Sequence, residues 1–500
     1  MGSNGGKGHF RLLVAATLFA FLLSIGAQVP DSALGADTQK KVTGTEANIG
    51  LNETQTILVA QKKSGQRNKK RNQPRNRRSQ AQNRRNQEAK RLEETANLPW
   101  PENVSKLAGS GAVLVQDRYA RRGEPKELFA LNPDQMYVPA SILKLVTAAA
   151  ALDILGPDRR FETDFALDDD GGLWVVGRGD PFLVSEELCS AVEALTRLGL
   201  KKVGNIYLDT SYFEPGLVLD GLTNTNYAYD AYTGALGVNF NTVNYLIDKA
   251  GQVVEYNDCT PLTPITIDLA SKNRPQNKKP RPGEYRINIS ESPQTAEKQS
   301  GQLIKALLEK SGVVVTGEVV LGGTVPASAM PLYTHVNSLN LEQMVTTLLE
   351  HSNNFMTNQI FLIMGAETYG PPANAAKSIQ AVFDYLGRKG VSMLKLVEGS
   401  GLSRNNSLSA RQMSEILSVF ESNRHLTTSN NDKSVFYKTG TMSDIQTLAG
   451  YLIRPDRPNE PLSFVILLNG KYAPGTREKI LAVLKAHFID EPQEKNSRKS

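Results

Sequence analysis

The sequence predicts an α/β (α+β) fold with a large, mostly β insertion and a disordered basic segment near the N-terminus. Apolar residues make up 40% of the 500 residues and charged residues 22%, which is a globular composition. Helical patterns occupy 141–155 and return after His335, whereas short apolar runs broken by Gly, Pro, Asn and Asp fill 165–335. The run 62–91 has no apolar periodicity.

Charge and cysteine content narrow the class of protein. The net charge is +6, but 62–91 holds thirteen Lys or Arg and one acid, Glu88, so the remainder is net negative. Two cysteines, Cys189 and Cys259, exclude a disulfide framework or a four-thiolate zinc site and leave one bridge possible. The five histidines lack ligand spacing, so we expect no metal or other cofactor.

The N-terminus has the pattern of an export signal. Lys7 and Arg11 precede an apolar run over 12–27, and small residues follow as far as Ala36. We expect 1–36 to be a signal peptide, cleaved after Ala27 or Ala36, or an uncleaved membrane anchor; a buried core helix is the alternative. A signal peptide or a membrane anchor predicts a periplasmic or other extracytoplasmic protein.

Residues 37–97 are predicted to be a disordered basic linker, because they cannot bury enough apolar surface to offset the entropy of ordering. One interpretation is a solvated spacer. Another is adhesion of 62–91 to an anionic membrane or polymer surface, where each Lys or Arg contributes about 1 kcal/mol. The run has no aromatic residue to stack on bases, so we expect no nucleic-acid partner.

The folded body is expected from about Pro99 to residue 490, followed by a polar tail over 491–500. Outside the insertion, strands are predicted at 111–115, 447–453 and 462–468, and helices at 141–155, 341–349, 354–364, 373–389, 410–420 and 476–488. Within it, strands are predicted at 173–176, 203–208 and 313–321, helices at 186–198 and 296–311, and a polar loop at 272–282. This divides the body into 98–164 plus 336–490, interrupted by 165–335.

Ser141-Ile-Leu-Lys144 is the first motif that carries chemistry. It begins an apolar helical pattern, and i,i+3 spacing on a helix places the lysine amine beside the serine hydroxyl. Serine is a weak nucleophile until a base takes its proton, and lysine is such a base only when burial or a second cation lowers its pKa. Ser392-Met-Leu-Lys395 has the same spacing without such a helix.

Two further motifs supply groups that such a nucleophile needs. Ser352-Asn353-Asn354 lies between two helical patterns, so its hydroxyl can pass a proton to a leaving group and the Asn354 amide can hold a carbonyl. Lys438-Thr439-Gly440 lies beside an apolar strand, where a cation and a hydroxyl suit an anionic group. Gly440 allows substrate to approach the strand closely.

These stretches resemble the active-site serine acyltransferases that bind penicillin. More narrowly, they resemble the D-alanyl-D-alanine carboxypeptidase/endopeptidase family of DacB type, the penicillin-binding protein 4-like class C of low molecular mass. Supporting stretches are Pro139-Ala-Ser-Ile-Leu-Lys144, Gly179-Asp-Pro181, Tyr227-Ala-Tyr-Asp-Ala231, Val238-Asn-Phe-Asn241, Gly399-Ser-Gly-Leu-Ser-Arg404, Tyr437-Lys-Thr-Gly-Thr441 and Leu448-Ala-Gly-Tyr451. The chain departs from the pattern at Glu398, where the family usually has Asp, and at Asn353, which often is Asp.

The resemblance covers about residues 100–490 and implies a serine β-lactamase/transpeptidase-like domain carrying an inserted domain between Ser141 and Ser352. It also implies residue roles. Ser141 attacks the carbonyl of a D-Ala peptide bond, Lys144 takes its proton, and Ser352 returns a proton to the departing amine. Substrate-binding roles fall to Asn354, Lys438, Thr439, Gly440 and Thr441, with backbone N–H groups of Ser141 and Thr441 as the oxyanion hole.

The implied activity is that of a serine-type D-Ala-D-Ala carboxypeptidase or endopeptidase. Its partners would be peptidoglycan peptides as substrates and β-lactam antibiotics as acylating inhibitors. Two alternatives stay open: a β-lactamase-like hydrolase with fast deacylation, and a cell-wall-binding protein without catalysis. The sequence leaves undecided whether cross-links are cut, and the oligomeric state.

Overall fold

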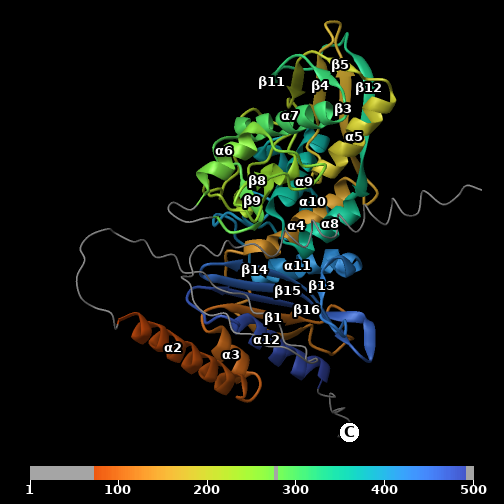
Figure 1. Ribbon diagram of the computed structural model, residues 1–500. Coiled ribbons are helices and arrows are strands. Elements are labelled where there is room, and N and C mark those ends of the chain that lie inside the picture. Colours follow the sequence, from red (N-terminus) through yellow and green to blue (C-terminus); the bar gives the residue numbers. More distant parts are fainter. Residues whose placement is uncertain (1–72, 275–279, 491–500) are drawn as a thin grey trace, which may run out of the picture. The chain divides into compact units, whose positions relative to one another are not determined.

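The computed structural model describes residues 73–274 and 280–490 of the chain (Figure 1). The predicted signal peptide or anchor at 1–36, most of the predicted linker, the middle of the 272–282 loop and the polar tail at 491–500 lie outside these residues. Within the described ranges, no helix combines the length and apolar character needed to cross a bilayer.

The prediction of disorder throughout 37–97 is wrong for its last part, because Gln73–Ala96 forms helix α2. The residues of α2 are mostly Gln, Arg, Ala, Glu and Lys, all of which have high helix propensity. Pro74 lies in the first turn, where proline is tolerated. A scarcity of apolar residues argues against a packed core but not against a solvated helix. The prediction inferred disorder from the lack of a core and so missed the helix.

The body is built on an antiparallel sheet of strand order β13-β14-β15-β16-β1-β2. The strands are β1 (Ala112–Gln116), β2 (Glu127–Leu131), β13 (Thr428–Ser429), β14 (Val435–Met442), β15 (Ile445–Arg454) and β16 (Arg457–Asn469). Helix α11 (Ala410–Phe420) covers one face, while α3 (Glu102–Ala108), α12 (Thr476–Lys485) and the π-helical turn η5 (Ala486–Asp490) lie on the other (Figure 1). Pairing of β1 with β16 joins the two ends of the body.

A helical layer adjoins this sheet. It contains the 3₁₀ turns η1 (Ala140–Leu143) and η4 (Glu421–Leu426), and the helices α4 (Lys144–Ile154), α8 (Leu341–Glu350), α9 (Asn354–Tyr369) and α10 (Ala375–Arg388). Helix α4 is buried from Lys144 to Ala151, and α8, α9, α10 and α11 all contact it. The nucleophile candidate Ser141 therefore lies in η1, directly before a deeply buried helix of this layer.

The insertion contains a mixed sheet of order β11-β6-β4-β3-β12, with α5 and α7 packed on it, and a small parallel pair β5–β10. The bounds are β3 (Arg160–Leu167), β4 (Leu173–Gly177), α5 (Ser185–Arg197), β5 (Lys202–Val203), β6 (Ile206–Asp209), α7 (Pro293–Lys310), β10 (Val314–Val315), β11 (Val319–Leu321) and β12 (Met330–Asn340). The core of this part includes Val175, Leu188, Leu208, Leu303 and Leu307.

A second part of the insertion has its own core. Strands β7 (Thr242–Ile247), β8 (Val253–Val254) and β9 (Gly283–Asn288) pair in the order β8-β7-β9 and pack with α6 (Pro264–Lys272) around Tyr245, Leu269 and Ile287. The short turns η2 (Ala228–Asp230) and η3 (Asn239–Asn241) precede it.

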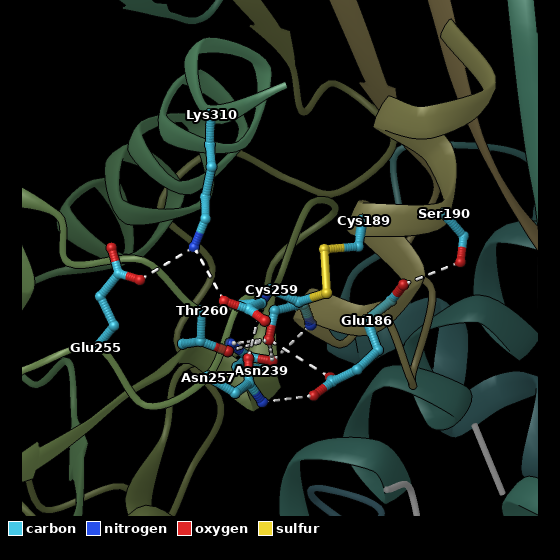
Figure 2. Close-up of a disulfide and its surroundings, with 11 residues drawn as sticks. Glu186, Cys189, Ser190, Asn239, Glu255, Asn257, Cys259, Thr260 and Lys310 are labelled. Atoms are coloured by element: carbon cyan, nitrogen blue, oxygen red, sulfur yellow. Dashed lines mark hydrogen bonds and ion pairs between the residues drawn. A yellow bond between two sulfur atoms is a disulfide. The ribbon is translucent and has the colours of Figure 1, made fainter. Parts of the chain in front are cut away.

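A disulfide between Cys189 of α5 and Cys259 links the two parts of the insertion, forming the one bridge that the cysteine count allowed (Figure 2). Beside it, the Asn257 side chain donates to Glu186 at 3.0 Å, and Lys310 reaches Glu255 at 3.0 Å (Figure 2). The bridge thus fixes the 255–260 loop to the mixed-sheet part.

The predicted elements are largely confirmed: 186–198 is α5, 373–389 is α10 and 410–420 is α11. Differences concern two strands and the helix ends. The predicted strand at 203–208 is divided into β5 and β6, and the one at 313–321 into β10 and β11. The predicted helix at 141–155 begins as a 3₁₀ turn, the one at 354–364 continues to Tyr369, and the last one leaves α-geometry after Lys485. The α/β fold class is confirmed.

Candidate active site

Ser141 and Lys144 meet at the junction of η1 and α4. The Lys144 Nζ lies 3.0 Å from the Ser141 Oγ, and the Lys144 side chain is fully buried. The preceding Ala140 has φ 48°, a left-handed conformation that costs of order 1–3 kcal/mol for a residue other than glycine. Strain immediately before the serine indicates that the surrounding packing dictates the geometry of this turn.

Two oxygens accept hydrogen bonds from the Lys144 amine. Its Nζ donates at 2.7 Å to the Asn354 Oδ1 and at 2.7 Å to the Ser400 carbonyl oxygen. A neutral amine has two N–H bonds and one lone pair, so these acceptors use both hydrogens and turn the lone pair toward the Ser141 hydroxyl. The arrangement is that of a base able to take the serine proton.

The charge environment keeps this base available. Burial lowers the pKa of Lys144 well below its ordinary value, the Lys438 cation lowers it further, and Glu398 opposes them. The shift favours the neutral amine that the hydrogen-bond geometry requires.

Lys438 on β14 holds the second hydroxyl. Its Nζ lies 3.0 Å from the Ser352 Oγ and donates at 3.0 Å to the Thr439 carbonyl oxygen. Burial, with the Arg477 guanidinium nearby, lowers the pKa of Lys438 to about 7. Ser352 itself has φ 54°, again a left-handed residue at the site. This pair forms a hydroxyl–amine relay that can carry a proton.

Strand β14 packs directly against the nucleophile turn. A Cβ added at Gly440 would lie 2.2 Å from the Thr447 Oγ1 and 2.9 Å from the Ser141 backbone nitrogen. Only glycine fits this approach, and Thr447 donates to the Pro139 carbonyl at 2.6 Å on the same contact. The packing therefore sets the strand that carries Thr439 and Thr441 beside Ser141.

Asn354 connects the site to the insertion. Its Nδ2 donates at 2.9 Å to the Tyr229 carbonyl, while its Oδ1 accepts from Lys144. One N–H of this amide stays free of these contacts and can reach a substrate carbonyl. The role of Asn353 is structural, because its side chain accepts from the Met356 N–H at 3.0 Å and caps α9, as Asp would also do.

The structure thus brings together the groups of the three motifs, from Ser141 and Lys144 through Ser352 and Asn354 to the 438–441 strand. Sequence reasoning missed Arg477, the buried arginine of α12. Its Nη1 donates at 2.6 Å to the Gly440 carbonyl and at 2.7 Å to the Thr441 Oγ1. Because arginine only donates, the Thr441 hydroxyl hydrogen is left for an incoming anion. No local pattern around Arg477 signals this contact.

Among the described residues, no group of three or more His, Cys, Asp and Glu side chains is arranged to hold a metal ion.

Comparisons with known proteins identify the family. Residues 105–431 match the model of the D-Ala-D-Ala carboxypeptidase 3 (S13) family. The chain is 29% identical over 437 residues to a D-alanyl-D-alanine carboxypeptidase of Actinomadura sp. strain R39, covering 73% of this chain and 79% of the relative. It is 26% identical over 403 residues to D-alanyl-D-alanine carboxypeptidase DacB of Haemophilus influenzae, covering 69% of this chain and 83% of the relative.

A solved structure shows the same fold. The crystal structure of penicillin-binding protein 4 (dacB) from Haemophilus influenzae superposes with a TM-score of 0.64 at 20% identity, covering 78% of this chain and 100% of that one. The match of sequence over most of the body, together with this fold, supports one conclusion: the chain belongs to the D-Ala-D-Ala carboxypeptidase 3 (S13) family and is a serine D-Ala-D-Ala peptidase.

Proposed function

We propose that this enzyme hydrolyses the D-Ala–D-Ala bond of peptidoglycan stem peptides through an acyl intermediate on Ser141. The observation that carries the proposal is the buried Lys144 amine, 3.0 Å from the Ser141 Oγ, with both hydrogens of its neutral form directed to other acceptors. A binding protein without catalysis has no need of a base held in this way.

In the first step the Ser141 Oγ attacks the substrate carbonyl and its proton passes to Lys144. The backbone N–H groups of Ser141 and Thr441 receive the developing oxyanion. Loss of one such donor typically costs about 3 kcal/mol of transition-state stabilisation. The close approach of Gly440 to the Ser141 nitrogen supports this pairing of donors.

The leaving amine then needs a proton, and Ser352 with Lys438 supplies the route. Lys438, Thr439 and Thr441 attract the carboxylate that follows the scissile bond. The contact of Arg477 with the Thr441 Oγ1 supports this assignment, because it leaves the hydroxyl free to donate. Water releases the acyl group in the final step.

We extend the proposal to β-lactam antibiotics as acylating inhibitors of Ser141. The structure of penicillin-binding protein 4 from Haemophilus influenzae has also been determined with a bound β-lactam; it matches this chain with a TM-score of 0.60 at 21% identity. A β-lactamase-like hydrolase is the second candidate. When the protein is incubated with labelled penicillin, we expect a stable label on the protein. Rapid turnover of penicillin would favour the β-lactamase.

Product analysis tests the main proposal and its specificity. Residues 98–500 are incubated with purified cross-linked muropeptide, and the products are identified by mass spectrometry. Release of free D-Ala identifies a carboxypeptidase, which the names of the relatives favour, whereas cut cross-links identify an endopeptidase. If the protein binds muropeptide but forms neither product, the catalytic proposal is overturned in favour of wall binding alone.

We also propose a periplasmic location, with export by 1–36. The disulfide between Cys189 and Cys259 supports it, because such bridges persist in oxidising compartments. The basic run 62–91 is proposed to hold the enzyme at an anionic membrane or polymer surface. Deletion of 62–91 should weaken retention at the cell surface and leave turnover of soluble peptide unchanged; unchanged retention would contradict it.

A further inference from the structure

Glu398 is a fully buried carboxylate that the catalytic steps above do not use. It begins the turn Gly399-Ser400-Gly401, and its partners are all donors. Oε2 accepts from the Ser400 N–H at 2.8 Å and the Ser400 hydroxyl at 2.6 Å. Oε1 accepts from the Gly401 N–H at 2.7 Å and the Asn406 Nδ2 at 2.7 Å. The carboxylate therefore forms the centre around which this turn folds.

The turn contacts the catalytic helix at successive residues. The Ser400 carbonyl accepts from the Lys144 Nζ at 2.7 Å, and the Gly399 carbonyl accepts from the Thr147 hydroxyl at 2.7 Å. A Cβ added at Gly401 would lie 2.0 Å from the Ala140 carbonyl oxygen, so Gly401 abuts the strained residue before Ser141. A shift of this turn would displace both the nucleophile and its base.

We propose that Glu398 is a positioning residue, which fixes the Ser400 carbonyl so that the lone pair of Lys144 faces the Ser141 hydroxyl. The inference rests on the proposed function and deepens it. Without the Ser400 acceptor, one hydrogen of the neutral amine would be free to point at Ser141, and the amine would donate to the hydroxyl instead of receiving its proton. Misplacement of a catalytic group by about 1 Å can cost about 100-fold in rate.

Glu398 also contributes charge. The groups facing the Lys144 amine are Lys438 from β14, Glu398 from its turn and the neutral Asn354 amide from α9; Arg477 lies beyond Lys438. The negative charge of Glu398 raises the pKa of Lys144 against the lowering by burial and Lys438. The acylation rate should rise with pH as Lys144 loses its proton and then reach a plateau. Removal of the Glu398 charge should shift this rise, the acid limb, to lower pH, and loss of orientation should lower the rate at the plateau.

The test compares the pH dependence of penicillin acylation in wild-type protein and three variants. Glu398→Gln removes the charge and places an amide N–H among donors, so we expect a plateau about 100-fold lower and an acid limb at lower pH. Glu398→Asp keeps the charge, so we expect the wild-type acid limb and most of the plateau. Glu421→Gln alters a buried carboxylate held by Arg118 and Tyr119, and should leave both unchanged.

Wild-type acylation and an unmoved acid limb in folded Glu398→Gln would overturn the inference, as would an equal effect of Glu421→Gln. If Glu398→Gln does not fold, Asn406→Ala removes one donor to the same carboxylate and keeps its charge. We then expect a plateau about tenfold lower with the acid limb unmoved, and a wild-type plateau would overturn the proposal. Absence of labelling in wild-type protein would instead refute the proposed acylation of Ser141 by β-lactams.

Discussion

The chain contains the pattern Ser-x-x-Lys in two regions, and only one of them forms a chemical site. Ser141 and Lys144 lie on consecutive turns of η1 and α4, with the lysine fully buried and 3.0 Å from the serine oxygen. Ser392 and Lys395 are exposed in a segment that is not helical, where Ser392 donates to Glu415 at 3.2 Å and Lys395 pairs through its backbone with Ser407.

The difference lies in backbone geometry and burial. On a helix, positions i and i+3 share a face, whereas along an extended segment they point to opposite sides. Burial then lowers the pKa of Lys144, because removal from water disfavours the charged amine. The spacing of two residues acquires catalytic meaning only from the helix and the packing around it.

Replacement of the two serines should give the largest contrast. Ser141→Ala removes the attacking oxygen, so we expect no covalent attachment of labelled penicillin. Ser392→Ala removes only a contact with Glu415 and should label as wild-type does. Intact-mass measurement after incubation with penicillin reads both outcomes, and a labelled Ser141→Ala would remove Ser141 as the nucleophile.

Replacement of the two lysines should give the next largest contrast. Lys144→Met keeps the length of the side chain but removes the base, so we expect acylation about 1000-fold slower, within the usual contribution of general-base catalysis. Lys395→Met should acylate at the wild-type rate, since the Lys395 side chain is exposed. The second-order rate constant of acylation measures both. A loss of less than tenfold in Lys144→Met would mean that another group takes the proton.

The smallest expected effect is on the pH dependence of kcat/KM, which reports the protonation of Lys144 and Lys438. Lys144 must be neutral to act, so kcat/KM should rise with pH through its lowered pKa, well below the ordinary lysine value. Lys438 must be protonated to donate and to attract a carboxylate, so kcat/KM should fall as pH rises through about 7.

A pH profile of peptide hydrolysis with Lys438→Arg tests these assignments. Arginine stays protonated, so the alkaline limb should disappear while the acid limb remains. Lys395→Arg is the matched control and should leave both limbs in place. Persistence of the alkaline limb in Lys438→Arg would assign that limb to another group.

Much of the body could be predicted from the sequence. Apolar periodicity located α5, α10 and α11 within a few residues, because long amphipathic helices express their burial in local spacing. The prediction for Gln73–Ala96 was wrong, since composition was used to judge core formation where local propensity governs a solvated helix. The separate core of the β7–β9 part was also beyond prediction, because strands from 242 to 288 pair across long loops.

The sequence motifs did not predict the roles of two residues at the site, Arg477 and Glu398. Arg477 contacts Gly440 and Thr441 from a helix that begins 35 residues later in the chain. Glu398 attracted notice only as a departure from Asp. Its link to Lys144 runs through Ser400, whose N–H donates to Glu398 and whose carbonyl accepts from Lys144. Neither link leaves a periodic signal, because Arg477 lies 36 residues from Thr441 and Ser400 lies 256 residues from Lys144 in the chain.

The sequence by itself determined the chemical groups at hand and the local helix that places Ser141 beside Lys144, because spacing on a helix is a local property. Only the tertiary structure decided that Lys144 is buried, that Asn354 and Ser400 take its hydrogens, and that Lys438 stands near enough to lower its pKa. Proton affinity depends on solvation and neighbouring charge, and both are set by segments far apart in the chain.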